Sequence, residues 1–157
     1  MRKLFAEELY KQMAENKNIW LITADLGYGL WDRHFKDFPE RTINTGAAEQ
    51  SATGIAVGLA LEGKIPFLYS ITTFLLYRSF ETIRNYINRE QIPVKLVASG
   101  RGKDYLHDGF SHWSEDAKNL FPTCFDCYKC KKKMFNNIFS WWPETKEEIP
   151  NLMQDFL

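Results

Sequence analysis

Short apolar runs that alternate with helical patterns constrain the fold of this chain more than any other feature. Strand-like runs lie at residues 19–24, 41–44, 65–70 and 93–98, and helical periods precede or separate them at residues 3–16, 48–61 and 72–89. The run at 19–24 (IWLITA) carries no charged residue, which is typical of a strand buried on both faces. Strands that alternate with helices favour an α/β fold with a parallel sheet.

Polar residues follow each of the predicted strands. The carboxyl ends of parallel strands meet at one edge of a sheet, and ligands of open α/β folds bind there. We therefore expect the functional residues along that rim, in Asp25 and in residues 45–49, 71–74 and 100–112. The last of these segments is polar, rich in glycine and holds two of the three histidines, and such loops often carry binding groups.

The composition is that of one ordinary globular domain. The 157 residues include 20 basic and 20 acidic side chains, so the net charge gives no reason to expect a nucleic acid or a membrane as partner. No apolar stretch approaches the roughly 20 residues that span a bilayer, and the first residues lead into an amphipathic helix rather than a signal peptide. The cysteines are three and closely spaced, which does not suggest a secreted disulfide framework. We expect a cytoplasmic protein.

Glu49 is the first candidate for chemistry. It lies at a predicted junction between strand and helix, among small residues (NTGAAEQ). The helix dipole stabilises a carboxylate in a first turn, so the spacing alone favours a structural acid over a catalytic one. Small residues continue along this helix, and Gly54 and Gly58 each cost about 1 kcal/mol in a helix interior. Tight packing within the domain and an interface with another element explain them equally well.

Three aromatic residues form the second candidate. Phe74, Tyr77 and Phe80 are spaced by three on the helix predicted at 72–89, and Arg84 follows, so these residues share one face. An aromatic stripe at helical spacing usually belongs to the core, and a flat platform for a heteroaromatic ligand is the alternative. Thr72 or Thr73 is expected to cap this helix. His112 either belongs to the binding loop or caps a helix that begins near residue 111.

The segments taken together resemble a known family. They are ADLG, FPERTINTGAAEQ, GLALEGKIPFLYSITTFLLYRSFETIR, PVKLVASGRG, DGFSHWSEDA and WWPETKEEIP. Their order and spacing are similar to the pyrimidine-binding domain of transketolases and of their split, two-chain relatives. The resemblance covers roughly residues 1–120 and resumes near Trp141. It implies a single domain over residues 1–157, with a three-layer α/β/α fold, a mostly parallel central sheet and an insertion at about 121–137.

The resemblance implies thiamine diphosphate as the cofactor. Glu49 matches the family's glutamate, which contacts N1′ of the aminopyrimidine and favours the imino form that takes the proton from C2 of the thiazolium. Phe74, Tyr77 and Phe80 match the aromatic positions around the pyrimidine ring. Glu49 and His112 are therefore the expected catalytic residues, since a histidine near the reactive carbon can move a proton or donate to a developing oxygen charge.

Further polar residues are expected to contact the substrate. Asp25, Asp108 and His112 match family positions near the substrate and the reactive carbon. Arg101 lies on the same loop and is expected to bind a phosphate or hydroxyl group, although it has no firm match. The implied reaction is transfer of a two-carbon ketol unit between sugar-like substrates. A non-catalytic scaffold or regulatory homologue and a component of a 2-keto acid decarboxylase or dehydrogenase are the alternatives.

The sequence also departs from the family in ways that predict a partner. These 157 residues contain no Gly-Asp-Gly…Asn pattern of the kind that holds Mg²⁺ and the diphosphate in the family, and we expect the third, C-terminal domain of full-length transketolases to be absent. We expect a diphosphate-binding (PP) subunit to supply the metal site, in a homodimer or a heterotetramer, and expect no metal ligands from this chain. Cys124, Cys127 and Cys130 have the spacing of metal ligands but no evident fourth, so a structural role is favoured over metal binding or redox chemistry.

Overall fold

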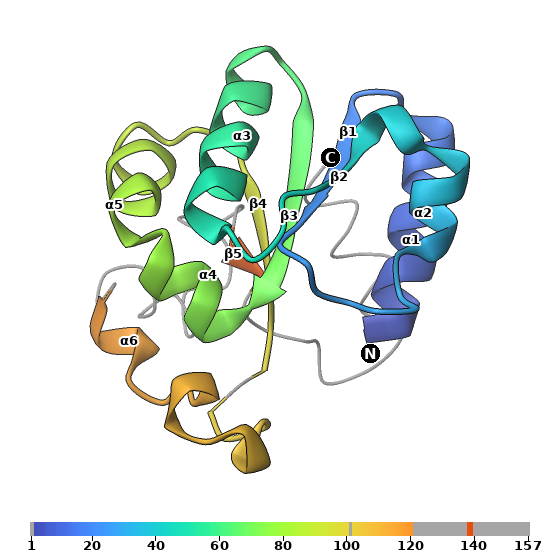
Figure 1. Ribbon diagram of the computed structural model, residues 1–157. Coiled ribbons are helices and arrows are strands. Elements are labelled where there is room, and N and C mark those ends of the chain that lie inside the picture. The colour runs from blue at the N-terminus through green and yellow to red at the C-terminus, as the bar shows by residue number, and fades with distance from the viewer. Residues whose placement is uncertain (1, 101, 121–137, 140–157) are drawn as a thin grey trace.

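A parallel sheet of five strands forms the centre of the structure (Figure 1). The computed structural model describes residues 2–100, 102–120 and 138–139. The strands are β1 (Ile19–Thr23), β2 (Thr42–Asn44), β3 (Ile65–Ile71), β4 (Lys95–Ser99) and β5 (Ile138–Phe139). Their order is β2-β1-β3-β4-β5 and every neighbouring pair is parallel, which confirms the predicted parallel sheet. The carboxyl ends of the strands point toward the bottom of Figure 1.

Helices cover both faces of the sheet, which confirms the three-layer α/β/α architecture (Figure 1). On one side lie α1 (Arg2–Glu15) and α2 (Asp32–Asp37), and on the other lie α3 (Glu49–Leu61), α4 (Thr72–Arg78), α5 (Phe80–Thr82) and the π-helix η2 (Ile83–Arg89). The remaining elements are α6 (Ala117–Leu120) and the 3₁₀ turns η1 (Pro39–Arg41), η3 (Leu106–Asp108) and η4 (Phe110–His112). The last two turns and α6 lie beyond the end of β4, on the predicted rim.

Alternating side chains of the strands belong to two separate hydrophobic clusters. In β1, Leu21 packs in the cluster that contains α1, whereas its neighbour Ile22 packs in the cluster that contains α3 and α4. To the cluster on its own side of the sheet, α3 contributes mainly small residues, the buried Ala52, Ala56 and Ala60, together with Val57. Small side chains let this helix approach the sheet closely. The first turn of α3 therefore lies next to the carboxyl ends of the strands.

The helix predicted at 72–89 is interrupted. α4 ends at Arg78, Ser79 is not helical, and the chain continues through α5 into the π-helix η2. The predicted threonine cap is wrong, because Ile71 occupies the cap position without a side-chain hydrogen bond. Thr72 Oγ1 instead donates to the carbonyl oxygens at the end of β4, and Thr73 Oγ1 donates to the carbonyl of Ser111 at 3.0 Å. These two hydroxyls tie the start of α4 to the rim.

Two further differences concern local elements. Residues 32–37 form α2, which is short and polar and was not predicted. The predicted strand at 93–98 begins two residues later, at Lys95, because Pro93 has no N–H to donate to a neighbouring strand. Among the residues that the structure describes, none of the helices has the length and apolar content that crossing a membrane requires.

Candidate functional site

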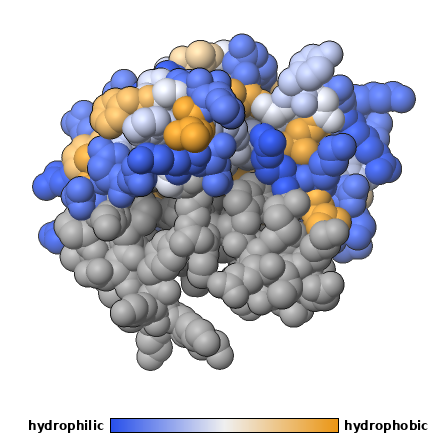
Figure 2. All heavy atoms as spheres, turned by 90° about the horizontal axis from the view of Figure 1, so that it is seen from below, coloured by the Kyte–Doolittle hydropathy of each residue, from blue (hydrophilic) through white to orange (hydrophobic). Residues whose placement is uncertain are grey.

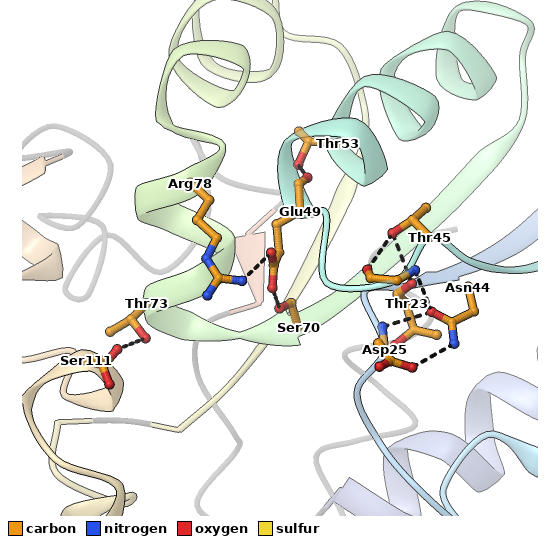
Figure 3. Close-up of polar contacts among 11 residues, drawn as sticks. Thr23, Asp25, Asn44, Thr45, Glu49, Thr53, Ser70, Thr73, Arg78 and Ser111 are labelled. Atoms are coloured by element: carbon orange, nitrogen blue, oxygen red, sulfur yellow. Dashed lines mark hydrogen bonds and ion pairs between the residues drawn. The ribbon is translucent and has the colours of Figure 1, made fainter.

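Glu49 is the first residue of α3, yet its side chain is almost fully buried, with 1% of its surface exposed. Ser70 Oγ, near the end of β3, donates to Glu49 Oε1 at 3.1 Å. Arg78 Nη1, on the last residue of α4, donates to Glu49 Oε2 at 2.6 Å (Figure 3). Burying a charge costs several kcal/mol unless it is paired and hydrogen-bonded. The position at a helix start is therefore not enough to explain this side chain, which points into the junction of three elements.

The turn before Glu49 is held by Asn44, the last residue of β2. Its side-chain carbonyl accepts the N–H groups of Asp25 and Gly46 at 2.9 and 3.0 Å, and its amide donates to Asp25 Oδ1 at 3.2 Å (Figure 3). Asp25 has φ of +57°, in the left-handed region that aspartate tolerates better than most residues. Asp25 thus lies on the predicted rim but is paired with Asn44 rather than with Glu49.

Arg78 joins the carboxylate to an aromatic ring. Its guanidinium carbon lies 4.0 Å from the centroid of the Phe74 ring, one helical turn earlier in α4. Phe74 also contacts His112, whose ring packs edge-on at a centroid distance of 4.8 Å. Glu49, Arg78, Phe74 and His112 therefore form a continuous row from the interior to the rim. The structure thus brings together three residues that the sequence singled out, and adds Arg78 between two of them.

Tyr77 and Phe80 lie apart from this row. Both are half-buried and pack against the hydrophobic cluster of α3 and α4, which agrees with the core interpretation of the stripe for these two rings. The hydroxyl of Tyr77 also donates to Asp116 Oδ1 at 2.5 Å. Burial first, and then this carboxylate, raises the pKa of the Tyr77 phenol. Tyr77 therefore fastens α4 to the start of α6, whereas Phe74 faces Arg78 and His112.

His112 does not cap a helix. It is the last residue of the turn η4, α6 begins only at Ala117, and Nδ1 of His112 lies 3.0 Å from the hydroxyl of Ser111. Its ring is also 6.1 Å from that of Tyr105. The capping alternative is therefore wrong, because the chain turns at residues 110–112 without starting an α-helix. His112 belongs to the loop that packs on α4.

The remaining predicted site residues are not part of the row. Asp108 ends the turn η3 and is exposed. Arg101 lies outside the described residues, as do the three cysteines and the expected insertion at about 121–137. Within residues 2–100, 102–120 and 138–139, no group of three or more His, Cys, Asp or Glu side chains could hold a metal ion.

Sequence reasoning missed three polar residues of the site: Ser70, Arg78 and Asn44. A signal was available for Arg78, because it follows Phe74 by four residues and so shares its helix face. Asn44 also carried a signal, since an asparagine at the end of a strand and two residues before a glycine often organises a turn. Ser70 had none, because a serine at the end of a buried strand has no distinctive pattern.

A buried carboxylate, paired with an arginine that stacks on an aromatic ring, lies at the carboxyl edge of the parallel sheet, which is where proteins of the open α/β class bind their ligands. Comparison with protein families identifies the family within this class. The family "Transketolase, pyrimidine binding domain" matches residues 1–154, and the chain belongs to this family.

Individual relatives agree with the family. A protein assigned as a transketolase C-terminal section in Methanocaldococcus jannaschii is 40% identical over 113 residues, which cover 71% of this chain and 36% of that protein. The 1-deoxy-D-xylulose-5-phosphate synthase of Dehalococcoides mccartyi is 36% identical over 112 residues, or 70% of this chain and 17% of the enzyme. This chain therefore matches well under two thirds of the length of these relatives.

A solved structure shows the same fold. It is a split gene transketolase in the form of an inactive tetramer of four β subunits, and it is 37% identical to this chain. The match has a TM-score of 0.64 and covers 76% of this chain and 38% of the other.

Proposed function

We propose that this chain is the pyrimidine-binding subunit of a split, thiamine-diphosphate-dependent enzyme that transfers two-carbon ketol units between sugar-like substrates. The observation that carries the proposal is the Glu49 carboxylate, buried and held by Ser70 and Arg78 at the strand edge of a transketolase pyrimidine-binding domain. A structural acid at a helix start gains from exposure to water, so its burial here supports a ligand as its purpose.

The residues of the row fit the pyrimidine part of the cofactor. When bound, thiamine diphosphate supplies a thiazolium ring that acts as the electron sink of the reaction. Glu49 would hold a proton at N1′ of the aminopyrimidine, and the ring of Phe74 would provide an apolar surface beside that heterocycle. His112, packed against Phe74, would donate to the substrate oxygen or move a proton.

The outer surface of α3 supports the need for a partner chain. Gly54 and Gly58 lie on the exposed side of α3, and among the described residues a Cβ added to either would meet no atom within 4 Å. Their cost to the helix is therefore not offset by packing against the part of the chain that the structure describes. Ile55 and Leu61 on the same side are 39% and 68% exposed. An apolar helix face of this kind favours association with another helix or domain.

We assign to that partner the diphosphate and Mg²⁺ site, with a Gly-Asp-Gly…Asn motif, and infer an assembly of two copies of each chain. Seen from the strand ends, the described residues present mostly hydrophilic side chains with separate apolar patches (Figure 2). The related split gene transketolase, which is inactive as a tetramer of β subunits, supports our inference that this chain is inactive alone.

The test is ketol transfer by the chain reconstituted with its partner subunit. We expect the wild-type complex to be active, and Glu49→Ala to abolish activity while the complex still assembles in size-exclusion chromatography. Wild-type turnover by the variant would refute the catalytic assignment of Glu49. An inactive wild-type complex of normal stoichiometry would favour a scaffold, and release of CO₂ from a 2-keto acid would contradict ketol transfer as the reaction.

A further inference from the structure

Arg78 covers the buried carboxylate of the site. Its side chain is 45% exposed, whereas that of Glu49 beneath it is 1% exposed. Ser70 occupies Oε1 from the β3 side, and Arg78 occupies Oε2 from α4 (Figure 3). Because almost none of the Glu49 surface is open to water, an external group reaches its carboxylate only after one of these neighbours has moved.

The guanidinium makes the two contacts that a bound aminopyrimidine would need. It is planar, donates an N–H to Glu49 Oε2 at 2.6 Å, and lies 4.0 Å from the centre of the Phe74 ring. An aminopyrimidine is also planar, hydrogen-bonds through ring and amino nitrogens and stacks on aromatic rings. We propose that Arg78 is a latch that occupies the pyrimidine position in the ligand-free chain and must swing out before the cofactor binds. This inference rests on the proposed function of Glu49 and Phe74.

Arg78 is placed to move more easily than Ser70. It is the last residue of α4, next to the break at Ser79, and its side chain is long and half exposed. An ion pair whose cation is this accessible to water holds its partners weakly, because solvent and salt screen the attraction. Ser70, in contrast, is fully buried in β3. Movement of Arg78 would therefore open the carboxylate from the α4 side, toward the rim that carries His112.

A latch that competes with the cofactor for one position lowers the apparent affinity of the protein for the cofactor. If the competent, open state is about one tenth of the population, the apparent dissociation constant is raised about tenfold over that of the open state. Removing the guanidinium should then tighten cofactor binding, although it removes a positive charge that would otherwise favour an anionic ligand. Loss of the latch strengthens cofactor binding, whereas loss of the positive charge weakens it. The direction of the change in affinity therefore identifies the latch.

Equilibrium binding of thiamine diphosphate with Mg²⁺ to the reconstituted complex tests the proposal. We expect Arg78→Ala to bind about tenfold more tightly than the wild type and Arg78→Lys to lie between the two. Arg84→Ala is the matched control, because it removes an equal charge from the exposed side of the adjoining π-helix without touching Glu49. Its affinity should equal that of the wild type. In the ligand-free full chain, the Nε–Hε signal of Arg78 in a ¹⁵N NMR spectrum should shift on Glu49→Gln.

The outcomes separate the latch from the proposed function. Unchanged or weaker binding by Arg78→Ala, together with loss of binding by Glu49→Gln, would overturn the latch and leave the cofactor site in place. Equal binding by Glu49→Gln and the wild type, or no binding by any variant, would overturn the proposed function and the latch with it. A melting curve of the Arg78→Ala complex confirms that the comparison is made on folded protein.

Discussion

Two buried titratable side chains lie on opposite sides of the sheet, and their surroundings differ. Glu49, on the α3 side, has a hydrogen-bond partner on each oxygen. His34, in α2 on the α1 side, is 2% exposed and neither ring nitrogen has a hydrogen-bond partner among the described residues. Its ring instead packs edge-on against the rings of Tyr10 and Trp31. The α1 side therefore buries a histidine as an apolar ring, whereas the α3 side maintains a charge next to the rim.

The difference separates a structural region from the candidate functional one. Burial lowers the pKa of His34 to about 4, so this ring is neutral near pH 7 and contributes to packing. On the other side, the carboxylate of Glu49 is held in place by an arginine from a different element. Polar groups that are buried and paired at a strand edge are candidates for function, whereas a neutral buried ring needs no ligand to explain it.

The largest effect is expected from acidification of the α1 side. The unfolded chain binds a proton at His34 near pH 6.5, but the folded chain binds it only near pH 4, so the unfolded state holds more protons between these values. The contribution to stability is therefore complete above pH 6.5 and falls as the pH drops toward 4, by roughly 3 kcal/mol. Urea unfolding between pH 7 and pH 4 measures this loss.

Two variants isolate the contribution of this histidine. His34→Phe should remove about 3 kcal/mol of the pH dependence, because the phenyl ring cannot be protonated. His107→Gln, at an exposed position, should leave the wild-type dependence unchanged. The same pH slope in wild type and His34→Phe would contradict the view that this ring is buried neutral.

An intermediate effect is expected on the outer face of α3. Gly54→Leu should stabilise the isolated chain by about 1 kcal/mol, because leucine is the better helix former and the position is open. The same change should weaken association with the partner subunit at least tenfold, since the leucine would obstruct the close approach of another helix. Urea unfolding and sedimentation velocity measure the two effects.

Gly54→Leu should raise the stability of the chain but weaken its association with the partner, and these opposite effects make the test specific. Glu7→Leu, on an exposed position of α1 outside the proposed interface, is the control for an added apolar side chain. It should leave association unchanged. If Gly54→Leu associates as the wild type does, the glycines of α3 do not mark the partner surface.

The smallest effect is expected at the turn before Glu49. Asn44→Ala removes three hydrogen bonds that hold Asp25 and Gly46, but the site is exposed and water replaces part of what is lost. We expect a loss of about 1 kcal/mol in unfolding free energy. Gln50→Ala, an exposed position in the first turn of α3, should change stability by less than this. A larger loss for Gln50→Ala would show that Asn44 does not organise the turn.

The sequence predicted the strands well because their signal is local. The apolar run at 19–24 contains β1 and that at 65–70 lies within β3, each to within one residue, since burial on both faces excludes polar residues. The helix of 72–89 was less well predicted. Its break at Ser79 and its π-helical second half depend on packing against α3 and the sheet, and side-chain periodicity does not record such a change of helix type.

The candidate site was predicted only in part, because some of its contacts follow from the order of the strands and others depend on how the helices pack. Glu49, Phe74 and His112 follow predicted strands. Because the carboxyl ends of parallel strands lie at one edge of the sheet, this was sufficient to predict that the three residues lie close together. The ion pair of Glu49 with Arg78 joins residues 29 positions apart and depends on how α4 crosses α3, which the sequence alone does not specify. The separation of Phe74 from Tyr77 and Phe80 likewise depends on which rings meet the core and which meet the loop at 110–112.

We propose that this chain contributes Glu49 to a cofactor site which only a second chain completes. Isothermal titration of thiamine diphosphate with Mg²⁺ into this chain alone, the partner alone and the complex tests it most directly. We predict tight binding by the complex, at one cofactor per copy of this chain, at least a hundredfold weaker binding by either chain alone, and a marked loss of affinity in the Glu49→Gln complex. Equally tight binding by this chain alone, or by the Glu49→Gln complex, would contradict the claim.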